Sequence, residues 1–213
     1  PWGSGKTHLI KQYLAAKLPN DPKHIYFSLY GISSWHDLQE ALFAAAYPIL
    51  YRKSTKLVGQ IAKSALGVLN ITINARLTDF AILPSNLVIV VDDLERCAMP
   101  ISDVLGFLNP LVEHDGFKII LLANQAEIAA SEDGSYRQKR EKLVGQVLAV
   151  RPDVNAAFGS FLESMACETT RSYLSQNSYV VSAVYEQSAT CNLRALKHTL
   201  LSFERLYMQL SET

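Results

Sequence analysis

The sequence of 213 residues has little of what marks secreted, membrane-spanning or strongly charged proteins. Its three cysteines, Cys97, Cys167 and Cys191, lie far apart and form no C-x-x-C pair, which argues against disulfides and zinc and fits free thiols in a reducing compartment. No run reaches the roughly 18 apolar residues of a membrane span, and no secretion signal starts the chain. Basic and acidic residues number 20 each, so no overall field attracts nucleic acid or an anionic membrane. We expect a cytoplasmic protein with no membrane span here, and leave nucleic-acid binding open.

What the sequence does have is a large apolar content, 49%, enough for one large domain or for a core with a small appendage. Its apolar pattern alternates between strand-like and helix-like segments up to residue 150 and is helical from 154 to 213. A capping box formed by Ser34 and Asp37 precedes one of the helices. Residues 54–69 form an amphipathic run, and residues 70–86 fit no single pattern. We predict strands at 24–30, 87–91, 117–123 and 147–150, and helices at 7–17, 38–51, 102–113 and 136–146.

Strands that alternate with helices, with connections long enough for right-handed crossovers, predict an α/β fold with a parallel sheet flanked by helices. Arg151-Pro152-Asp153 reads as a boundary. We therefore predict an α/β core at 1–152 and a C-terminal helical lid subdomain at 153–213, whose last helix is capped by Asn192. Ligands of open parallel sheets bind beyond the carboxyl ends of the strands, so we expect the ligand-binding residues there.

The opening residues PWGSGKT contain the end of a phosphate-binding loop, G-x-x-x-x-G-K-[ST]. The first glycine of that pattern would stand one residue before Pro1, so we expect that this sequence begins inside the loop and that the strand feeding the loop lies upstream. The alternative is a glycine-rich turn before an ordinary helix.

If the loop is a phosphate-binding loop, its glycines let the backbone curl around the phosphates at the start of a helix, where unpaired amides favour anions. Lys6 then supplies positive charge to the β- and γ-phosphates, and the Thr7 hydroxyl coordinates Mg²⁺. The expected nucleotide-binding residues are Gly3, Ser4, Gly5, Lys6, Thr7 and His8.

Two aspartates, Asp92 and Asp93, end the strongest strand pattern, LVIVV at 87–91. We expect Asp92 to hold Mg²⁺ through its water shell and Asp93 to orient or deprotonate the attacking water. Glu95 is a weaker candidate for that base because it lies two residues further into the turn, and Arg96 can pair with a nearby carboxylate. The alternative for each aspartate is a helix N-cap or a solvated turn.

Asn124 follows the next strand pattern, KIILLA. Many ATPases with a phosphate-binding loop place a polar residue here, between the attacking water and the γ-phosphate. The alternative is a simple turn former. Guanine-specific proteins with a phosphate-binding loop carry N-K-x-D at the position of Asn124 and D-x-x-G after the strand that corresponds to 87–91. This chain has NQAE and DDLE instead, so we favour ATP over GTP.

Basic residues crowd the segment YRQKREKLVGQ at 136–146, as on an ordinary solvated helix face. The alternative is an arginine finger. Ring-forming ATPases of this fold place an arginine just before the last core strand, where it stabilises the γ-phosphate bound to the neighbouring subunit. Arg137 or Arg140 holds that position, and Arg140 is the candidate that we carry forward. Arg194, at the start of the last helix, is a candidate sensor of hydrolysis or a partner in a salt bridge. None of the five histidines has a second histidine or cysteine at ligand spacing.

The opening PWGSGKT, the string VVDDLERC at 90–97, the tract EKLVGQVLAV at 141–150 and NLRALKH at 192–198 resemble the KAP P-loop NTPases. The resemblance implies an ATP-hydrolysing domain related to signal-transducing and ring-forming ATPases, in a family whose bacterial members include phage-exclusion proteins. Many members insert membrane spans between the two nucleotide motifs, whereas residues 38–82 here are amphipathic and interrupted by lysines.

We therefore expect an ATPase that uses Mg²⁺ as a signalling or anti-phage defence switch, with self-association or a protein effector as its output. The alternatives are an ATP-driven motor that remodels DNA or protein, and a nucleotide-binding scaffold without turnover.

Overall fold

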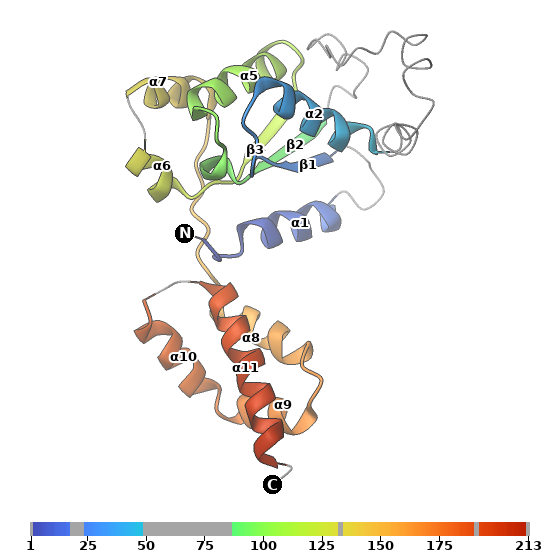
Figure 1. Ribbon diagram of the computed structural model, residues 1–213, viewed down its shortest axis with the longest axis vertical. Helices are drawn as coiled ribbons and strands as arrows, with labels where there is room; N and C mark the ends of the chain where they lie inside the picture. The colour runs from blue at the N-terminus through green and yellow to red at the C-terminus, as the bar shows by residue number, and fades with distance from the viewer. Residues whose placement is uncertain (1, 18–23, 49–86, 132–133, 190–191, 212–213) are drawn as a thin grey trace. The chain divides into compact units, whose positions relative to one another are not determined.

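The computed structural model describes residues 2–17, 24–48, 87–131, 134–189 and 192–211 (Figure 1). The chain divides into two compact units, one formed by Lys11–Val147 and the other by Pro1–Ile10 with Leu148–Thr213. Helix α1 (Lys6–Lys17) confirms the helix predicted at 7–17, and its residues are divided between the two units. The predicted run at 54–69, the ambiguous segment 70–86 and the end of the helix predicted at 38–51 lie outside the described residues. The predicted domain boundary at residue 152 stays a prediction.

The unit Lys11–Val147 contains a parallel sheet of three strands in the order β1-β2-β3 (Figure 1). The strands are β1 (His24–Ser28), β2 (Val88–Asp92) and β3 (Lys118–Leu121). β2 is the central strand and is buried at all positions after its first, as its continuous branched sequence predicts. The register pairs Ser28 with Asp92, so the carboxyl ends of β1 and β2 lie side by side. The predicted α/β fold with a parallel sheet is confirmed.

Helices α2 (Trp35–Ala46) and α5 (Ile101–Glu113) pack their apolar residues against the sheet. The capping box is confirmed at the start of α2, where the Ser34 side chain accepts a hydrogen bond from the Asp37 amide at 3.2 Å. Ile25 and Phe27 of β1 face this core. The residues that alternate with them face the other side of the sheet, where Lys11 of α1 lies over the ring of Tyr26. The fully buried members of this core include Leu29, Leu38, Leu42, Ile89, Val91, Val104, Leu105, Leu108 and Leu111.

The second unit contains a cluster of four helices, as predicted for residues 154–213: α8 (Val154–Glu163), α9 (Glu168–Gln176), α10 (Ser178–Gln187) and α11 (Leu193–Ser211). The Asp153 side chain caps α8 by accepting from the Ala156 amide at 3.0 Å. The apolar core of this cluster includes Phe158, Leu162, Leu174, Leu196 and Leu200.

Two parts of the chain differ from the prediction. Residues 147–150, predicted as a strand, form none, and Val147 and Leu148 are 59% and 76% exposed. Branched residues favour a strand only where a neighbouring strand pairs with them, and these residues join no sheet. The chain also forms α6 (Gln125–Ser131) and the short 3₁₀ helix η2 (Leu94–Arg96), which were not predicted, whereas α7 (Gly134–Leu143) matches the predicted helix at 136–146.

Candidate functional site

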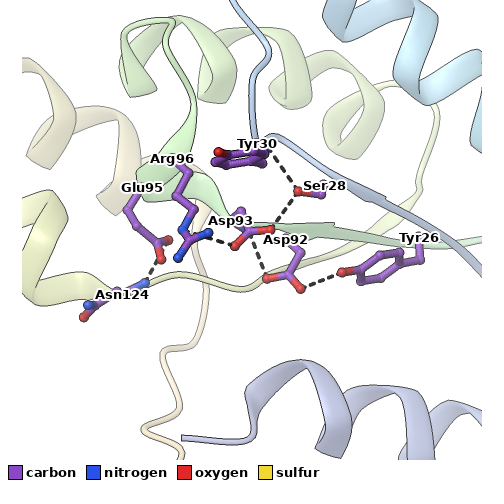
Figure 2. Close-up of polar contacts among 8 residues, drawn as sticks. All are labelled: Tyr26, Ser28, Tyr30, Asp92, Asp93, Glu95, Arg96 and Asn124. Carbon is purple, nitrogen blue, oxygen red and sulfur yellow. Dashed lines mark hydrogen bonds and ion pairs between the residues drawn. The ribbon is translucent and has the colours of Figure 1, made fainter. Parts of the chain in front are cut away.

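The candidate site of the sheet unit lies at the carboxyl ends of the strands (Figure 2). Asp92 is the last residue of β2, Asp93 follows it, and η2 comes directly after. Asn124 lies between β3 and α6, so both of the polar positions predicted beyond the strands fall at the same edge of the sheet. A ligand-binding position beyond the carboxyl ends is the usual one in parallel sheets.

Asp92 is a buried carboxylate, 6% exposed, and each of its oxygens accepts a hydrogen bond. The phenol of Tyr26, from β1, donates to Oδ2 at 2.7 Å, and the amide of Asp93 donates to Oδ1 at 2.8 Å (Figure 2). Burial of the phenol, together with its bond to Asp92 and the charges of Asp92 and Asp93, raises the pKa of Tyr26 far above its ordinary value. Tyr26 therefore stays protonated at physiological pH and remains a donor to Asp92.

Asp93 has a left-handed backbone, with φ 58° and ψ 40°, a conformation that aspartate tolerates better than most residues. Its Oδ2 accepts a hydrogen bond from the Ser28 hydroxyl at 2.7 Å, and its Oδ1 lies 3.8 Å from Nε of Arg96. The Arg96 guanidinium also lies over the ring of Tyr30, 5.5 Å from its centroid. The expected pairing of Arg96 with a nearby carboxylate is confirmed, and the Asp93 carboxylate is held from two sides.

Glu95 links the turn after β2 to the end of β3. Its Oε2 accepts a hydrogen bond from the backbone amide of Asn124 at 3.0 Å (Figure 2). The Asn124 carbonyl accepts from the amides of Glu127 and Ile128 at the start of α6. Asn124 therefore lies directly before this helix, three residues beyond the end of β3. Asn124 is also buried, at 5% exposed. Glu95 thus supports the backbone of Asn124, and its ranking below Asp93 as a base stays a prediction.

The opening loop belongs to the other unit and has the backbone of a tight glycine turn. Gly3 and Gly5 have φ values of 72° and 89°, a region that favours glycine. Helix α1 begins directly after Gly5, whose carbonyl accepts from the Leu9 amide at 2.9 Å. Lys6 and Thr7 therefore stand in the first turn of a helix, where a phosphate-binding loop requires them. Ser4 is buried and His8 is exposed in that same stretch.

The two predicted arginines lie in different units. Arg140 is in α7, half-buried, with its guanidinium 5.9 Å from the ring centroid of Tyr136. Arg194 is exposed in the first turn of α11, and its amide donates to the Asn192 side chain at 3.0 Å, which confirms the predicted cap. Their roles as finger and sensor stay predictions.

The structure thus brings Asp92, Asp93 and Asn124 to one edge of the sheet unit, whereas the opening loop and Arg194 are described within the other unit. The convergence of Lys6 with the aspartates stays a prediction. Sequence reasoning missed the β1 residues Tyr26 and Ser28, although their alternation with the buried Ile25 and Phe27 is a period-of-two signal that places them on the opposite face.

Comparison with known proteins shows the family. The model of the KAP family P-loop domain matches residues 1–79 and 72–210. The chain belongs to this family. As a KAP P-loop domain it is a nucleotide-binding domain of the P-loop NTPase class, and its parallel sheet with flanking helices agrees with that fold. No curated protein matches the sequence.

Two further findings concern the described part of this KAP domain alone. None of its helices there is both long enough and apolar enough to cross a bilayer. Within the same residues, no group of three or more His, Cys, Asp or Glu side chains could hold a metal ion.

Proposed function

We propose that this KAP domain binds ATP with Mg²⁺ and hydrolyses the γ-phosphate, and that it works as a switch. The observation that carries the proposal is the pair of adjacent carboxylates at the end of β2, each held by a different donor from β1. A solvated turn would not need such support. Two carboxylates held in different orientations allow two different roles, one toward a cation and one toward water.

The residues present fit Mg²⁺. This ion takes oxygen ligands in an octahedral arrangement, keeps several waters, and is usually held by one or two carboxylates with substrate phosphates. In this proposal the Asp92 carboxylate would hold the ion through its water shell, and the Thr7 hydroxyl of the opening loop would be a direct ligand. When bound, the ion would neutralise negative charge on the substrate phosphates. Tyr26 and the Asp93 amide hold the Asp92 carboxylate in one orientation.

Asp93 is the proposed base. It accepts a proton from water while the water oxygen attacks the γ-phosphorus; the bond from that phosphorus to the bridging oxygen breaks, and ADP and phosphate form. Asn124 orients the water, and the amides of residues 3–8 with the Lys6 ammonium hold the phosphates. Arg140 stabilises the charge that develops on the γ-phosphoryl group, and Arg194 reports hydrolysis to the helical residues 153–213, which form the lid.

In this proposal the domain is a cytoplasmic module of signalling or anti-phage defence, and ATP controls its self-association or a protein effector. A scaffold without turnover is the competing function, and turnover decides between them.

Two variants test the proposal in the full chain. Lys6→Ala removes the charge that faces the β- and γ-phosphates, and we expect ATP affinity to fall at least tenfold by equilibrium titration. Lys17→Ala, at the exposed end of the same helix, is the matched control and should bind as the unmodified chain does. Unchanged affinity in Lys6→Ala would reject the loop assignment.

Asp93→Asn keeps the size of the side chain and its tolerance of a left-handed backbone while it removes the base. We expect ATP affinity within about threefold of the unmodified chain and phosphate release lowered by about 10²-fold or more. Equal phosphate release by both proteins would remove Asp93 from the mechanism, and no release by the unmodified chain would favour the scaffold.

A further inference from the structure

The start of helix α11 contacts the opening loop within one compact unit. The backbone amide of Leu193 donates a hydrogen bond to the carbonyl of Gly3 at 2.9 Å. Leu193 is the first residue of α11, so its amide belongs to the group of N–H donors that a helix cannot satisfy internally. The Gly3 carbonyl therefore accepts a hydrogen bond from a helix amide that has no partner within the helix.

The approach of the two segments is close. A Cβ atom on Gly3 would overlap the side-chain oxygen of Asn192, and one on Gly5 would lie 3.7 Å from the Leu193 side chain. The same Asn192 oxygen accepts from the amides of Arg194 and Ala195, at 3.0 and 3.2 Å. The cap of α11 and the opening loop are thus fitted to each other.

This bond has a geometric consequence for the next residue of the loop. The carbonyl of Gly3 and the amide N–H of Ser4 belong to one planar trans peptide unit, so they point in opposite directions. A donor that holds the carbonyl therefore also sets the direction of the Ser4 N–H. Backbone N–H groups that point into the loop are what binds phosphate oxygens in such loops.

We propose that Leu193 is a positioning residue of the phosphate loop: through its backbone amide, the first turn of α11 holds the Gly3–Ser4 peptide unit in the orientation that aims the Ser4 amide at a nucleotide phosphate. The helical residues are then a structural part of the nucleotide site as well as a reporter of hydrolysis. This inference rests on the proposed nucleotide site in the opening loop.

The substitution Leu193→Pro tests this proposal, because it removes the amide donor at position 193. Proline is favoured at the first position of a helix, where its missing N–H breaks no intrahelical bond. The Leu193 side chain packs against the helical core, so proline also loses apolar contact. Leu193→Ala is the matched control, because it loses similar contact and keeps the amide.

The measurement is the affinity of the full chain for a non-hydrolysable ATP analogue with Mg²⁺, with thermal unfolding curves of all three proteins beside it. We expect Leu193→Pro to bind about 2- to 10-fold more weakly than Leu193→Ala, as the loss of one backbone hydrogen bond predicts. In the unmodified chain, the analogue should also slow hydrogen exchange of the Leu193 amide, because coupling between two sites is reciprocal.

Equal affinity of Leu193→Pro and Leu193→Ala, with the unmodified chain binding the analogue, would overturn this inference and leave the proposed function standing. Absence of binding by the unmodified chain would reject the proposed function and this inference with it. If Leu193→Pro melts well below Leu193→Ala, exchange at the Leu193 amide of the unmodified chain decides: slower exchange with nucleotide supports the coupling, and unchanged exchange contradicts it.

Discussion

Removal of one hydroxyl, by Tyr26→Phe, tests the support of the buried Asp92 carboxylate. Phenylalanine keeps the ring and leaves no cavity, so the change removes little more than the 2.7 Å hydrogen bond to Asp92 Oδ2. A hydrogen bond to a charged group contributes about 1.5–3 kcal/mol. Because Asp92 is only 6% exposed, water cannot readily replace the phenol, and we expect a loss of about 2 kcal/mol in the free energy of unfolding.

The assay is equilibrium unfolding in denaturant at pH 7, supported by thermal unfolding, where about 2 kcal/mol corresponds to a lowering of roughly 4–8 °C for a chain of this size. Tyr30→Phe is the control, because that side chain is 69% exposed and loss of its hydroxyl should change stability by less than about 0.5 kcal/mol. An effect of Tyr26→Phe no larger than that of Tyr30→Phe would refute the reasoning.

The same pair predicts a pH dependence. The folded-state pKa of Tyr26 is raised above its ordinary value of 10.0, so the unfolded chain loses this proton first as pH rises. The unfolded state then binds fewer protons than the folded state, and the stability that Tyr26 provides falls above pH 10. One group gives a slope of at most about 1.4 kcal/mol per pH unit, and solvent screening of this half-buried ring lowers it. The difference in stability between the unmodified chain and Tyr26→Phe should therefore shrink above pH 10 and stay constant from pH 7 to 9.

Cys167 and the cap of helix α8 give two further predictions. The Thr169 hydroxyl, 3.1 Å from the Cys167 sulfur, lowers the pKa of Cys167 to about 7, whereas burial raises the pKa of Cys97. Iodoacetamide at pH 7.5 should therefore alkylate Cys167 at least about tenfold faster than Cys97, as read by site-resolved mass spectrometry. Equal rates would contradict this, and Thr169→Ala should move the midpoint of the Cys167 pH profile upward. Asp153→Ala removes the cap of α8 and should cost about 1 kcal/mol in denaturant unfolding, whereas Glu163→Ala, at the other end of that helix, should be nearly neutral; equal losses would argue against the cap.

The strands were predictable because their residues carry strong local signals. The run at 87–91 has no polar residue, which is typical of the central strand of a parallel sheet, and the structure makes it β2. Since parallel strands end at one edge, the meeting of Asp92, Asp93 and Asn124 followed from their positions after two such runs. The caps at Ser34 and Asn192 are equally local, because each side chain bonds to amides two or three residues away.

The contacts between strands were not predictable from one sequence. The bonds of Tyr26 to Asp92 and of Ser28 to Asp93 depend on the register of β1 against β2, and a shift of one residue would turn both side chains to the opposite face. The strand predicted at 147–150 was wrong for a related reason. Its branched residues favour a strand, but pairing with a neighbouring strand decides whether one forms. Helix α6 was missed because seven residues are too few for a clear helical period.

The left-handed backbone of Asp93 restricts which acid can serve at that position. Asparagine and aspartate occupy this conformation at low cost because their short polar side chains interact locally, whereas a longer side chain loses that compensation and faces about 1–2 kcal/mol of steric penalty. A glutamate would also carry its carboxylate one methylene beyond the point where the Ser28 hydroxyl meets it. The backbone therefore limits the chemistry here: exchange of one acid for the other, a mild change on most protein surfaces, should behave at position 93 as a change of both conformation and reach.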